Sequence, residues 1–275
     1  MNFRIIREFS VRDMVSDMDF DGSQKLIGRG AQAEVYCYHG YAYKVYKPTY
    51  PEEWIAFEKQ QQQVVNQLGL CPVRYYDTDD AHIIKMDLIE GIQLEEKVLA
   101  GYLEGFGLLA EAFRRVRAVD VTTKDVQMPR LTDTAGMGLS DEEKNKIFPL
   151  IERLFEKFPP CVCHLDMHFL NIMLPENGGD GAAASSETAT RDASDGAAAF
   201  AGEDFIIIDW MNARIAPALF DYARTYVIFD EFSKEALEIY KKVVAQDIEA
   251  LGISDSDFAD AVEVCKVIRK REKES

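Results

Sequence analysis

The segment "CHLDMHFLNIML", residues 163–174, places two of the chain's four histidines, an aspartate and an asparagine among apolar residues. His164, Asp166 and His168 stand on alternate positions, which is the spacing of side chains that share one face of a strand. This spacing allows two interpretations. Either the histidines and the aspartate bind a metal, or a strand ends within the segment and a loop carries Asp166 and Asn171.

The second interpretation gains support from a partner segment. If the strand ends at Leu165, Asp166 and Asn171 lie on the loop that follows. A second apolar run, "FIIIDW" at 205–210, predicts a strand paired with the first segment and ends in Asp209. Two carboxylates and an amide then supply hard oxygen ligands that suit Mg²⁺, and one carboxylate remains to orient a hydroxyl.

A zinc site is the alternative interpretation of the same segment. Zinc in proteins takes four nitrogen, sulfur or carboxylate ligands, so a second ligand cluster must lie nearby. The other two histidines, His39 and His82, stand in the strand-rich first third of the chain. We therefore favour magnesium over zinc.

Composition limits the class of protein. The chain has 275 residues, 47% of them hydrophobic, which is enough for a large core. A net charge of −17 argues against nucleic acid as a partner, and most of this charge falls after residue 90, which favours a cationic small molecule. No apolar run suits a membrane span or a secretion signal, and the five cysteines form no Cys-x-x-Cys pair, so we expect a cytoplasmic protein.

Residues 1–90 are expected to form an N-terminal lobe. The stretch "KLIGRGAQAEVYCYHGYAYKVYKP" predicts three antiparallel strands joined by a glycine loop and by a turn at 39–40. A helix over 51–68 follows, with Gly69 placed to end it. The segments "PVRYYDT" and "AHIIKMDLI" predict two more strands, which gives five strands and one helix.

The glycine loop carries Gly28 and Gly30 and is followed by a strand. A dinucleotide-binding fold requires a helix at that place, so this class of site is excluded. A loop whose backbone approaches phosphate oxygens fits better, with Val35 as an apolar cover over a base. Turns also use glycine for its backbone freedom alone, so the loop by itself is weak evidence.

Lys44 lies on the third expected strand, and Ala42 shares its face. Glu58 lies on the apolar stripe of the helix over 51–68, which must face the sheet. A buried carboxylate requires a cation, and Lys44 is the nearest candidate. Such a pair would hold the lysine ready for phosphate oxygens.

Residues 91–275 change to helical periodicity and are expected to form a larger, mainly helical C-terminal lobe. Apolar stripes at 108–116, 147–158, 237–251 and 258–268 predict helices, and Ser140 with Glu143 forms a capping box. The segment at 176–203 consists almost entirely of Gly, Ala, Ser, Thr and Asp, which predicts a flexible insertion at a hairpin tip.

The order of these motifs resembles that of the protein-kinase-like superfamily. The resemblance covers residues 25–210 and implies an α+β, bilobal protein-kinase-like fold that uses ATP and Mg²⁺. It implies that Asp166 is the catalytic base, that Lys44 binds the phosphates, and that Asn171 and Asp209 hold the metal. The segment "KMDLIEG" looks like the hinge, so the backbone of Asp87 and Ile89 would contact the adenine.

One branch of the superfamily fits best. Protein kinases carry an arginine before the catalytic aspartate and a long segment after the metal-binding aspartate. Here Leu165 takes the arginine's place, and only eleven residues separate Asp209 from Asp221. The sequence "IDW", followed by "APALFDYA", looks like the aminoglycoside phosphotransferase and choline kinase branch, in which the aspartate at 221 is structural.

Four positions depart from that branch. Ala33 replaces the third glycine of the loop, Leu165 stands where glycine is usual, Met211 stands where an acid is common, and Arg117 stands where many relatives carry a histidine. None of these departures removes a catalytic group. The sequence therefore predicts a kinase that phosphorylates the hydroxyl of a small molecule: an aminoglycoside, amino sugar, choline-like compound or sugar. A nucleotide-binding pseudokinase or scaffold and a protein kinase remain the alternatives, and the acceptor, the choice between ATP and GTP and the oligomeric state are left open.

Overall fold

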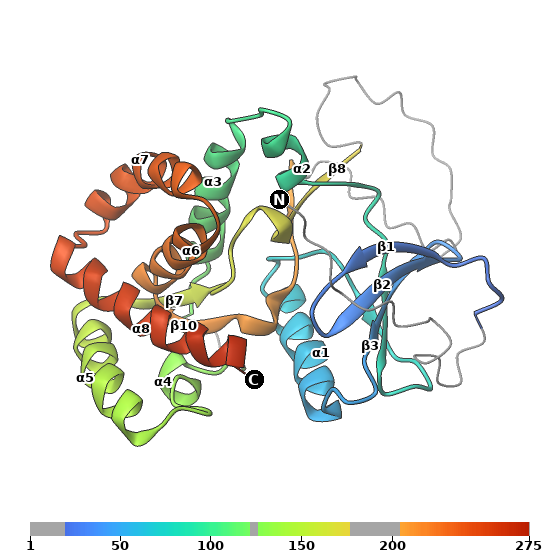
Figure 1. Cartoon of the computed structure of the whole chain (residues 1–275), viewed down its shortest axis with the longest axis horizontal. Helices are drawn as coiled ribbons and strands as arrows, with labels where there is room; N and C mark the ends of the chain where they lie inside the picture. The colour runs from blue at the N-terminus through green and yellow to red at the C-terminus, as the bar shows by residue number, and fades with distance from the viewer. Residues whose placement is uncertain (1–19, 122–125, 177–203, 275) are drawn as a thin grey trace. The chain divides into compact units, whose positions relative to one another are not determined.

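A computed structural model of the chain describes residues 20–121, 126–176 and 204–274 (Figure 1). These residues divide into two compact units. The first unit comprises 20–63 and 73–90, and the second comprises 64–72 and the described residues from 91 onward. The insertion expected at 176–203 lies outside the described residues except for Glu176.

The first unit contains an antiparallel sheet of five strands in the order β1-β2-β3-β5-β4, which confirms the predicted sheet. At the turn between the second and third strands, His39 and Gly40 both have positive φ, 47° and 75°. A two-residue hairpin of this kind matches the twist of its strands, and glycine adopts it without strain. The strands are β1 (Lys25–Arg29), β2 (Ala33–Tyr38), β3 (Tyr41–Tyr46), β4 (Tyr75–Tyr76) and β5 (Ile83–Asp87).

Helix α1 (Glu52–Gln67) covers part of one face of this sheet. Its Ile55 packs in a buried cluster with Ala33, Tyr46 and Ile84. The helix ends before Gly69, whose φ of +74° is the left-handed conformation that commonly terminates a helix. The other face of the sheet has its own apolar cluster, built on Tyr36, Tyr43, Val45 and Ile83.

The second unit is mainly helical, as predicted. A core cluster of this unit joins α5, α6 and α8 through residues such as Ile147, Phe220 and Ala261. Ser140 caps α5 and forms the expected capping box with Glu143. Among the described residues, no helix combines the length and the apolar character that a membrane span requires. The helices are α2 (Leu94–Leu99), α3 (Gly105–Arg117), α4 (Leu131–Thr134), α5 (Asp141–Lys157), α6 (Leu219–Phe232), α7 (Lys234–Ala250) and α8 (Asp255–Glu274).

Two small sheets carry the segments singled out in the sequence. Strand β8 (Ile172–Pro175) pairs with β9 (Ile206–Ile207), so the expected pairing joins the end of the 163–174 segment to the first half of "FIIIDW". Strand β6 (Gly91–Gln93) flanks β8 on its other side. Strand β7 (Pro160–Cys163), which enters the 163–174 segment, instead pairs with β10 (Arg214–Pro217). We did not expect β10, because a four-residue strand that contains a proline gives no alternating pattern.

Candidate functional site

Lys44 and Glu58 form an ion pair in the first unit, with 2.7 Å between Nζ and Oε1. The Glu58 side chain is 2% exposed, and it also accepts hydrogen bonds from the hydroxyls of Tyr46 and Tyr75. Glu58 is a buried carboxylate that is both paired and hydrogen-bonded, which is the arrangement that makes its burial tolerable. The pair fixes the Lys44 ammonium at one position above the sheet.

The candidate base-binding residues lie around Lys44 on the same face of the sheet. Val35 is the direct cross-strand neighbour of Lys44, and Cys37 is that of Ala42. Because side chains directly opposite each other in an antiparallel pair share a face, Val35, Ala42 and Lys44 point to one side. Ala42 is buried, and Val35 is half-buried.

The two glycines of the loop are not required by the fold itself. Neither Gly28 nor Gly30 has a positive φ. A methyl group added at Gly28 would be in ordinary contact with Val35, at 3.5 Å, and one added at Gly30 would lie 3.4 Å from the carbonyl oxygen of Ala33. Alanine therefore nearly fits at both positions, so the reason for glycine lies outside the hairpin's own packing.

At the end of β5, the Asp87 carboxylate is hydrogen-bonded within the first unit. It accepts hydrogen bonds from the Arg74 backbone N–H at 2.9 Å and from the Tyr76 hydroxyl at 2.7 Å. The expected contact of Asp87 with a base would use its backbone, not this side chain. Ile89 lies two residues further on, in the segment without regular structure that precedes β6.

In the second unit, the loop after β7 is held by Asp221 of α6. The buried carboxylate accepts the backbone N–H groups of His164 at 3.0 Å and Leu165 at 2.6 Å. Burial raises the pKa of Asp221 to about 7, although these two hydrogen bonds act to lower it. Leu165 has a φ of 58°, a left-handed conformation that glycine adopts without strain. Asp221 thus holds the start of this loop against α6, which is a structural contact of the kind that the resemblance implies.

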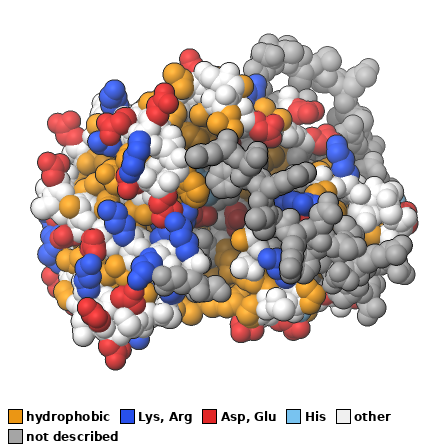
Figure 2. Space-filling view, viewed as in Figure 1, with side chains coloured by type: hydrophobic (Ala, Val, Ile, Leu, Met, Phe, Trp, Pro, Cys, Tyr) orange, Lys and Arg blue, Asp and Glu red, His pale blue; other side chains and the backbone are white. Residues whose placement is uncertain are grey.

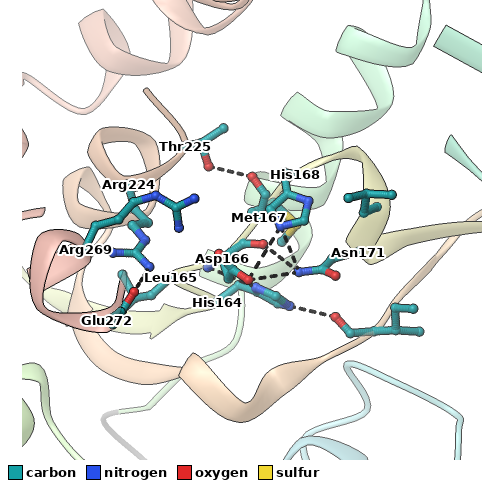
Figure 3. Close-up of polar contacts among 12 residues, drawn as sticks. His164, Leu165, Asp166, Met167, His168, Asn171, Arg224, Thr225, Arg269 and Glu272 are labelled. Atoms are coloured by element: carbon teal, nitrogen blue, oxygen red, sulfur yellow. Dashed lines mark hydrogen bonds and ion pairs between the residues drawn. The ribbon is translucent and has the colours of Figure 1, made fainter. Parts of the chain in front are cut away.

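Asp166 follows on this loop (Figure 3). Its side chain is 20% exposed, and its Oδ2 lies 3.5 Å from Nε2 of His168 and 3.3 Å from Nδ2 of Asn171. Burial would raise the pKa of Asp166, but the hydrogen bond and charge of His168, with the charges of Arg224 and His164, lower the pKa to about 2. Asp166 is therefore an ionised, positioned carboxylate at neutral pH.

Asn171 and Asp209 lie next to each other because β8 pairs with β9. The Ile208 backbone N–H donates to the Asn171 carbonyl at 2.9 Å, and Asp209 is the next residue. Asn171 is buried, and its side-chain nitrogen donates to Asp166, so its Oδ1 is the atom suited to a cation. Asp209 has a φ of 62°, a left-handed conformation that is unusual for a residue other than glycine.

The donor set fits magnesium and not zinc. Mg²⁺ is commonly held by one or two protein oxygens together with water and phosphate oxygens. Asn171 and Asp209 could supply these protein oxygens. His164 is buried, its Nδ1 accepts the Asp166 N–H at 3.2 Å, and its Nε2 lies 3.0 Å from the Ile208 carbonyl. Both ring nitrogens are thereby occupied, and within the described ranges no three His, Cys, Asp or Glu side chains form a metal-binding group.

The structure adds residues around the loop that sequence reasoning missed. The Thr225 hydroxyl donates to the Met167 carbonyl at 2.6 Å, and Arg224 contributes to the field at Asp166. Both follow Asp221 within about one helical turn, so the spacing on α6 was the available signal. Arg117, singled out earlier as a departure, binds the Tyr222 hydroxyl at 2.5 Å and Asp247 at 3.3 Å, which ties α3 to α6 and α7.

Comparison of sequences finds no relatives. No protein-family model matches the chain, and no curated protein matches it significantly. Comparison of structures does find similar folds.

The choline kinase LicA from Streptococcus pneumoniae aligns with a TM-score of 0.58 and 16% identity over 91% of this chain and 84% of its own. The aminoglycoside phosphotransferase APH(4)-Ia, a thermostable mutant, gives 0.55 and 11% over 91% and 88%. A Plasmodium vivax ethanolamine kinase gives 0.55 and 11% over 94% and 75%. The chain therefore has the α+β protein-kinase-like fold that these small-molecule kinases share.

Proposed function

We propose that the protein is an ATP- and Mg²⁺-dependent kinase that transfers the γ-phosphoryl group to a hydroxyl of a small molecule. The observation that carries this proposal is the constellation of Asp166, Asn171 and Asp209 on a loop fixed by Asp221. The structural neighbours support it, because they are a choline kinase, an ethanolamine kinase and an aminoglycoside phosphotransferase, and one choline kinase structure contains AMP.

Asp166 would accept the hydrogen bond of the acceptor hydroxyl and aim its oxygen at the phosphorus. Its low pKa, about 2, makes it a weak base. This suits phosphoryl transfer, in which the transition state is loose and catalysis comes mainly from positioning and charge stabilisation. Asn171 and Asp209 would hold Mg²⁺, which would neutralise charge on the phosphates. The hydrogen bond from Asn171 to Asp166 keeps the carboxylate in one orientation.

The nucleotide half of the proposal uses the first unit. Lys44, held by Glu58, would bind phosphate oxygens. Gly28 and Gly30 would let the loop backbone approach the phosphates, and Val35 and Ala42 would contact the base. The backbone of Asp87 and Ile89 would bind the adenine edge. The glycines support this assignment, because the fold alone does not require them.

The segment after Asp209 argues against a protein kinase. The residues up to Asp221 are taken up by a short 3-10 helix (Trp210–Asn212), by β10 and by the start of α6. Strand β10 is paired with β7, and Asp221 is bonded to the catalytic loop, so this segment is part of the core. A peptide-binding platform would need additional chain here. The acceptor is therefore a small molecule in our proposal.

We also expect the protein to act in the cytoplasm. All five cysteines lie among the described residues as thiols, and three of them are buried. Free thiols are typical of proteins in a reducing compartment.

A phosphorylation screen tests the proposal. Purified protein is incubated with labelled ATP, Mg²⁺ and a panel of aminoglycosides, amino alcohols, sugars and peptides, and Asp166→Asn serves as the control. We expect label to move to at least one small hydroxyl compound with the wild type only. Label on peptides alone would indicate a protein kinase. Binding of ATP without transfer or hydrolysis across the panel would indicate a pseudokinase or scaffold.

A further inference from the structure

Arg224 is a buried cation beside the catalytic loop. It lies on α6 one turn after Asp221, and its side chain is 4% exposed. Its guanidinium forms an ion pair with Glu272 near the end of α8, and its buried Nε has no hydrogen-bond partner among the described residues. A buried donor left without a partner costs free energy, so this N–H is suited to an acceptor atom of a ligand.

Two more arginines lie close to the same glutamate. Arg271 of α8 places its guanidinium 3.8 Å from the second oxygen of Glu272. Arg214 is the cross-strand neighbour of Cys163, at the start of the catalytic loop. Burial lowers the pKa of Arg214 to about 10. The charge of Glu272 acts to raise this pKa, and the charge of Arg271 acts to lower it. The Glu272 carboxylate thus pairs with Arg224 and acts on the charges of Arg271 and Arg214. The Arg214 guanidinium also donates to Thr134, Met211 and Ala213, and that of Arg271 donates to the Met137 carbonyl.

We call Arg214, Arg224 and Arg271 the arginine cluster, and its member Arg224 lies beside the loop that carries the residue proposed to hold the acceptor hydroxyl. Arg224 and Glu272 lie on one side of the loop that carries Asp166, and Asn171 lies on the other (Figure 3). Arg224 and Asp166 are close enough for each charge to act on the other. An acceptor whose hydroxyl meets Asp166 would have its remaining atoms next to the cluster.

The local charge is opposite to that of the chain as a whole. The chain carries −17, which favoured a cationic acceptor. On the face seen in Figure 2, Lys and Arg side chains lie among Asp and Glu side chains, so the surface is not uniformly acidic. Guanidinium groups bind carboxylates and phosphates through paired, charge-assisted hydrogen bonds, whereas they repel a cation. The charges next to the reacting group, and not the net charge, decide which acceptor fits.

We propose that the acceptor carries an oxyanion group, a carboxylate or a phosphate ester, which binds Arg224 with Arg214 and Arg271 beside it. This inference rests on the proposed kinase function and specifies its substrate class. Glu272 is the internal carboxylate that occupies Arg224 until the acceptor replaces it. Its side chain is 30% exposed and belongs to the last turns of α8, so the exchange requires only a local movement.

Two matched sets of compounds test this inference by calorimetry on the full chain without nucleotide. One set is glucose, glucosamine, gluconate and glucose 6-phosphate, and the other is glycerol, choline, glycerate and glycerol 3-phosphate. We expect an anionic member of a set to bind at least about tenfold more tightly than its neutral and cationic counterparts. The carboxylate and phosphate members show which of the two oxyanions is preferred.

Charge-changing variants test whether anion binding depends on Arg224, Arg271 and Glu272. Glu272→Gln removes the competing carboxylate and should tighten anion binding several-fold, whereas Arg271→Gln and Arg224→Lys should weaken it. Lys241→Gln and Glu238→Gln, at an exposed ion pair on α7, change charge equally and should leave binding unchanged. Circular dichroism would show whether each variant is folded. If Arg224→Lys does not fold because the residue is buried, Arg271→Gln alone tests the loss of anion binding.

The outcomes separate this inference from the kinase proposal. Preference for glucosamine or choline, weaker binding with Glu272→Gln, or no binding by any compound would overturn the oxyanion site. Transfer of phosphate from ATP only to neutral or cationic acceptors would also overturn it and leave the kinase intact. Anion binding with the expected variant effects, but without phosphoryl transfer, would support the site and contradict the kinase function.

Discussion

The carboxylate of Asp221 accepts the backbone N–H of Leu165 at 2.6 Å, across 56 residues of sequence. Its other oxygen accepts the N–H of His164 at 3.0 Å, and the aspartate is buried. The loop that carries Asp166 is therefore attached to α6 through two backbone hydrogen bonds. Any change at Asp221 is expected to move the Asp166 carboxylate as well as to alter stability.

Asp221 should make stability depend on pH. Its folded pKa, about 7, lies above the value of about 4 for an aspartate in an unfolded chain. The folded state therefore binds the proton more tightly, so this group's contribution is fully present below about pH 4 and is lost as the pH rises through about 7. Urea unfolding from pH 4 to 8 should show wild type losing stability relative to Asp221→Asn, by at most about 1.4 kcal/mol per pH unit.

The amide in Asp221→Asn does not titrate, so the pH dependence of this variant's stability reports the titration of all other groups. It offers a single acceptor oxygen for two N–H donors, which should lower its stability by about 1–3 kcal/mol at pH 5. A constant difference between the two proteins from pH 4 to 8 would contradict the assignment of the pKa to Asp221.

Leu165 should tolerate glycine unusually well. Its φ of 58° strains a leucine by about 1–2 kcal/mol, and glycine removes that strain. Leu165→Ala loses the same apolar contacts but keeps the strain. We expect Leu165→Gly to unfold at the same or a higher urea concentration than Leu165→Ala. At Leu170, where φ is not positive, the order should reverse, since glycine there only adds freedom to the unfolded chain. The same order at both positions would show that Leu165 is not strained.

The Lys44–Glu58 pair allows stability to be separated from ligand binding. Lys44→Met leaves the buried Glu58 carboxylate without its cation and should destabilise the protein by about 2–4 kcal/mol. The double variant Lys44→Met/Glu58→Met removes both charges and should regain most of this loss. Neither protein should bind ATP normally, as measured by calorimetry. Recovery of ATP affinity in the double variant would exclude Lys44 as a phosphate ligand.

The glycine loop should affect nucleotide affinity and not stability. Gly28→Ala and Gly30→Ala fit the hairpin, so their melting temperatures should stay near that of wild type, while ATP affinity falls about tenfold or more. Gly40→Ala is the matched control. Because Gly40 has a φ of +75°, alanine there should destabilise by about 1 kcal/mol and leave ATP affinity intact. Unchanged ATP affinity in both loop variants would remove the loop from the nucleotide site.

Substitutions of Asp166 and Asp209 should impair the protein in different ways. Asp166→Asn keeps the shape of the loop but not the charge, so turnover should fall by two or more orders of magnitude with nucleotide affinity nearly kept. Asp209→Asn should lose the increase in ATP affinity that Mg²⁺ gives. Calorimetry with and without Mg²⁺, together with steady-state rates, distinguishes these outcomes. Equal and mild effects of both substitutions would contradict the assigned roles.

Local patterns were sufficient for much of the fold. The five-stranded sheet, the helix that carries Glu58 and the capping box at Ser140 follow from periodicity and terminal signals, which depend on neighbouring residues. The ion pair of Lys44 with Glu58 was also predictable, because a carboxylate on an apolar stripe requires a cation. The short strand β10 was not, since its four residues are defined by their partner β7.

The sequence alone predicts which residues carry the chemistry. Asp166, Asn171 and Asp209 have the types and order that a magnesium-dependent transfer requires, and these depend only on the chain. The tertiary structure decided what surrounds them. It showed that Asp221 holds the loop through two backbone hydrogen bonds, that both nitrogens of His164 are occupied, and that the charge of Arg224 acts on Asp166. The physical reason is that electrostatic fields and buried hydrogen bonds depend on distances in space, and segments far apart in the sequence create them together.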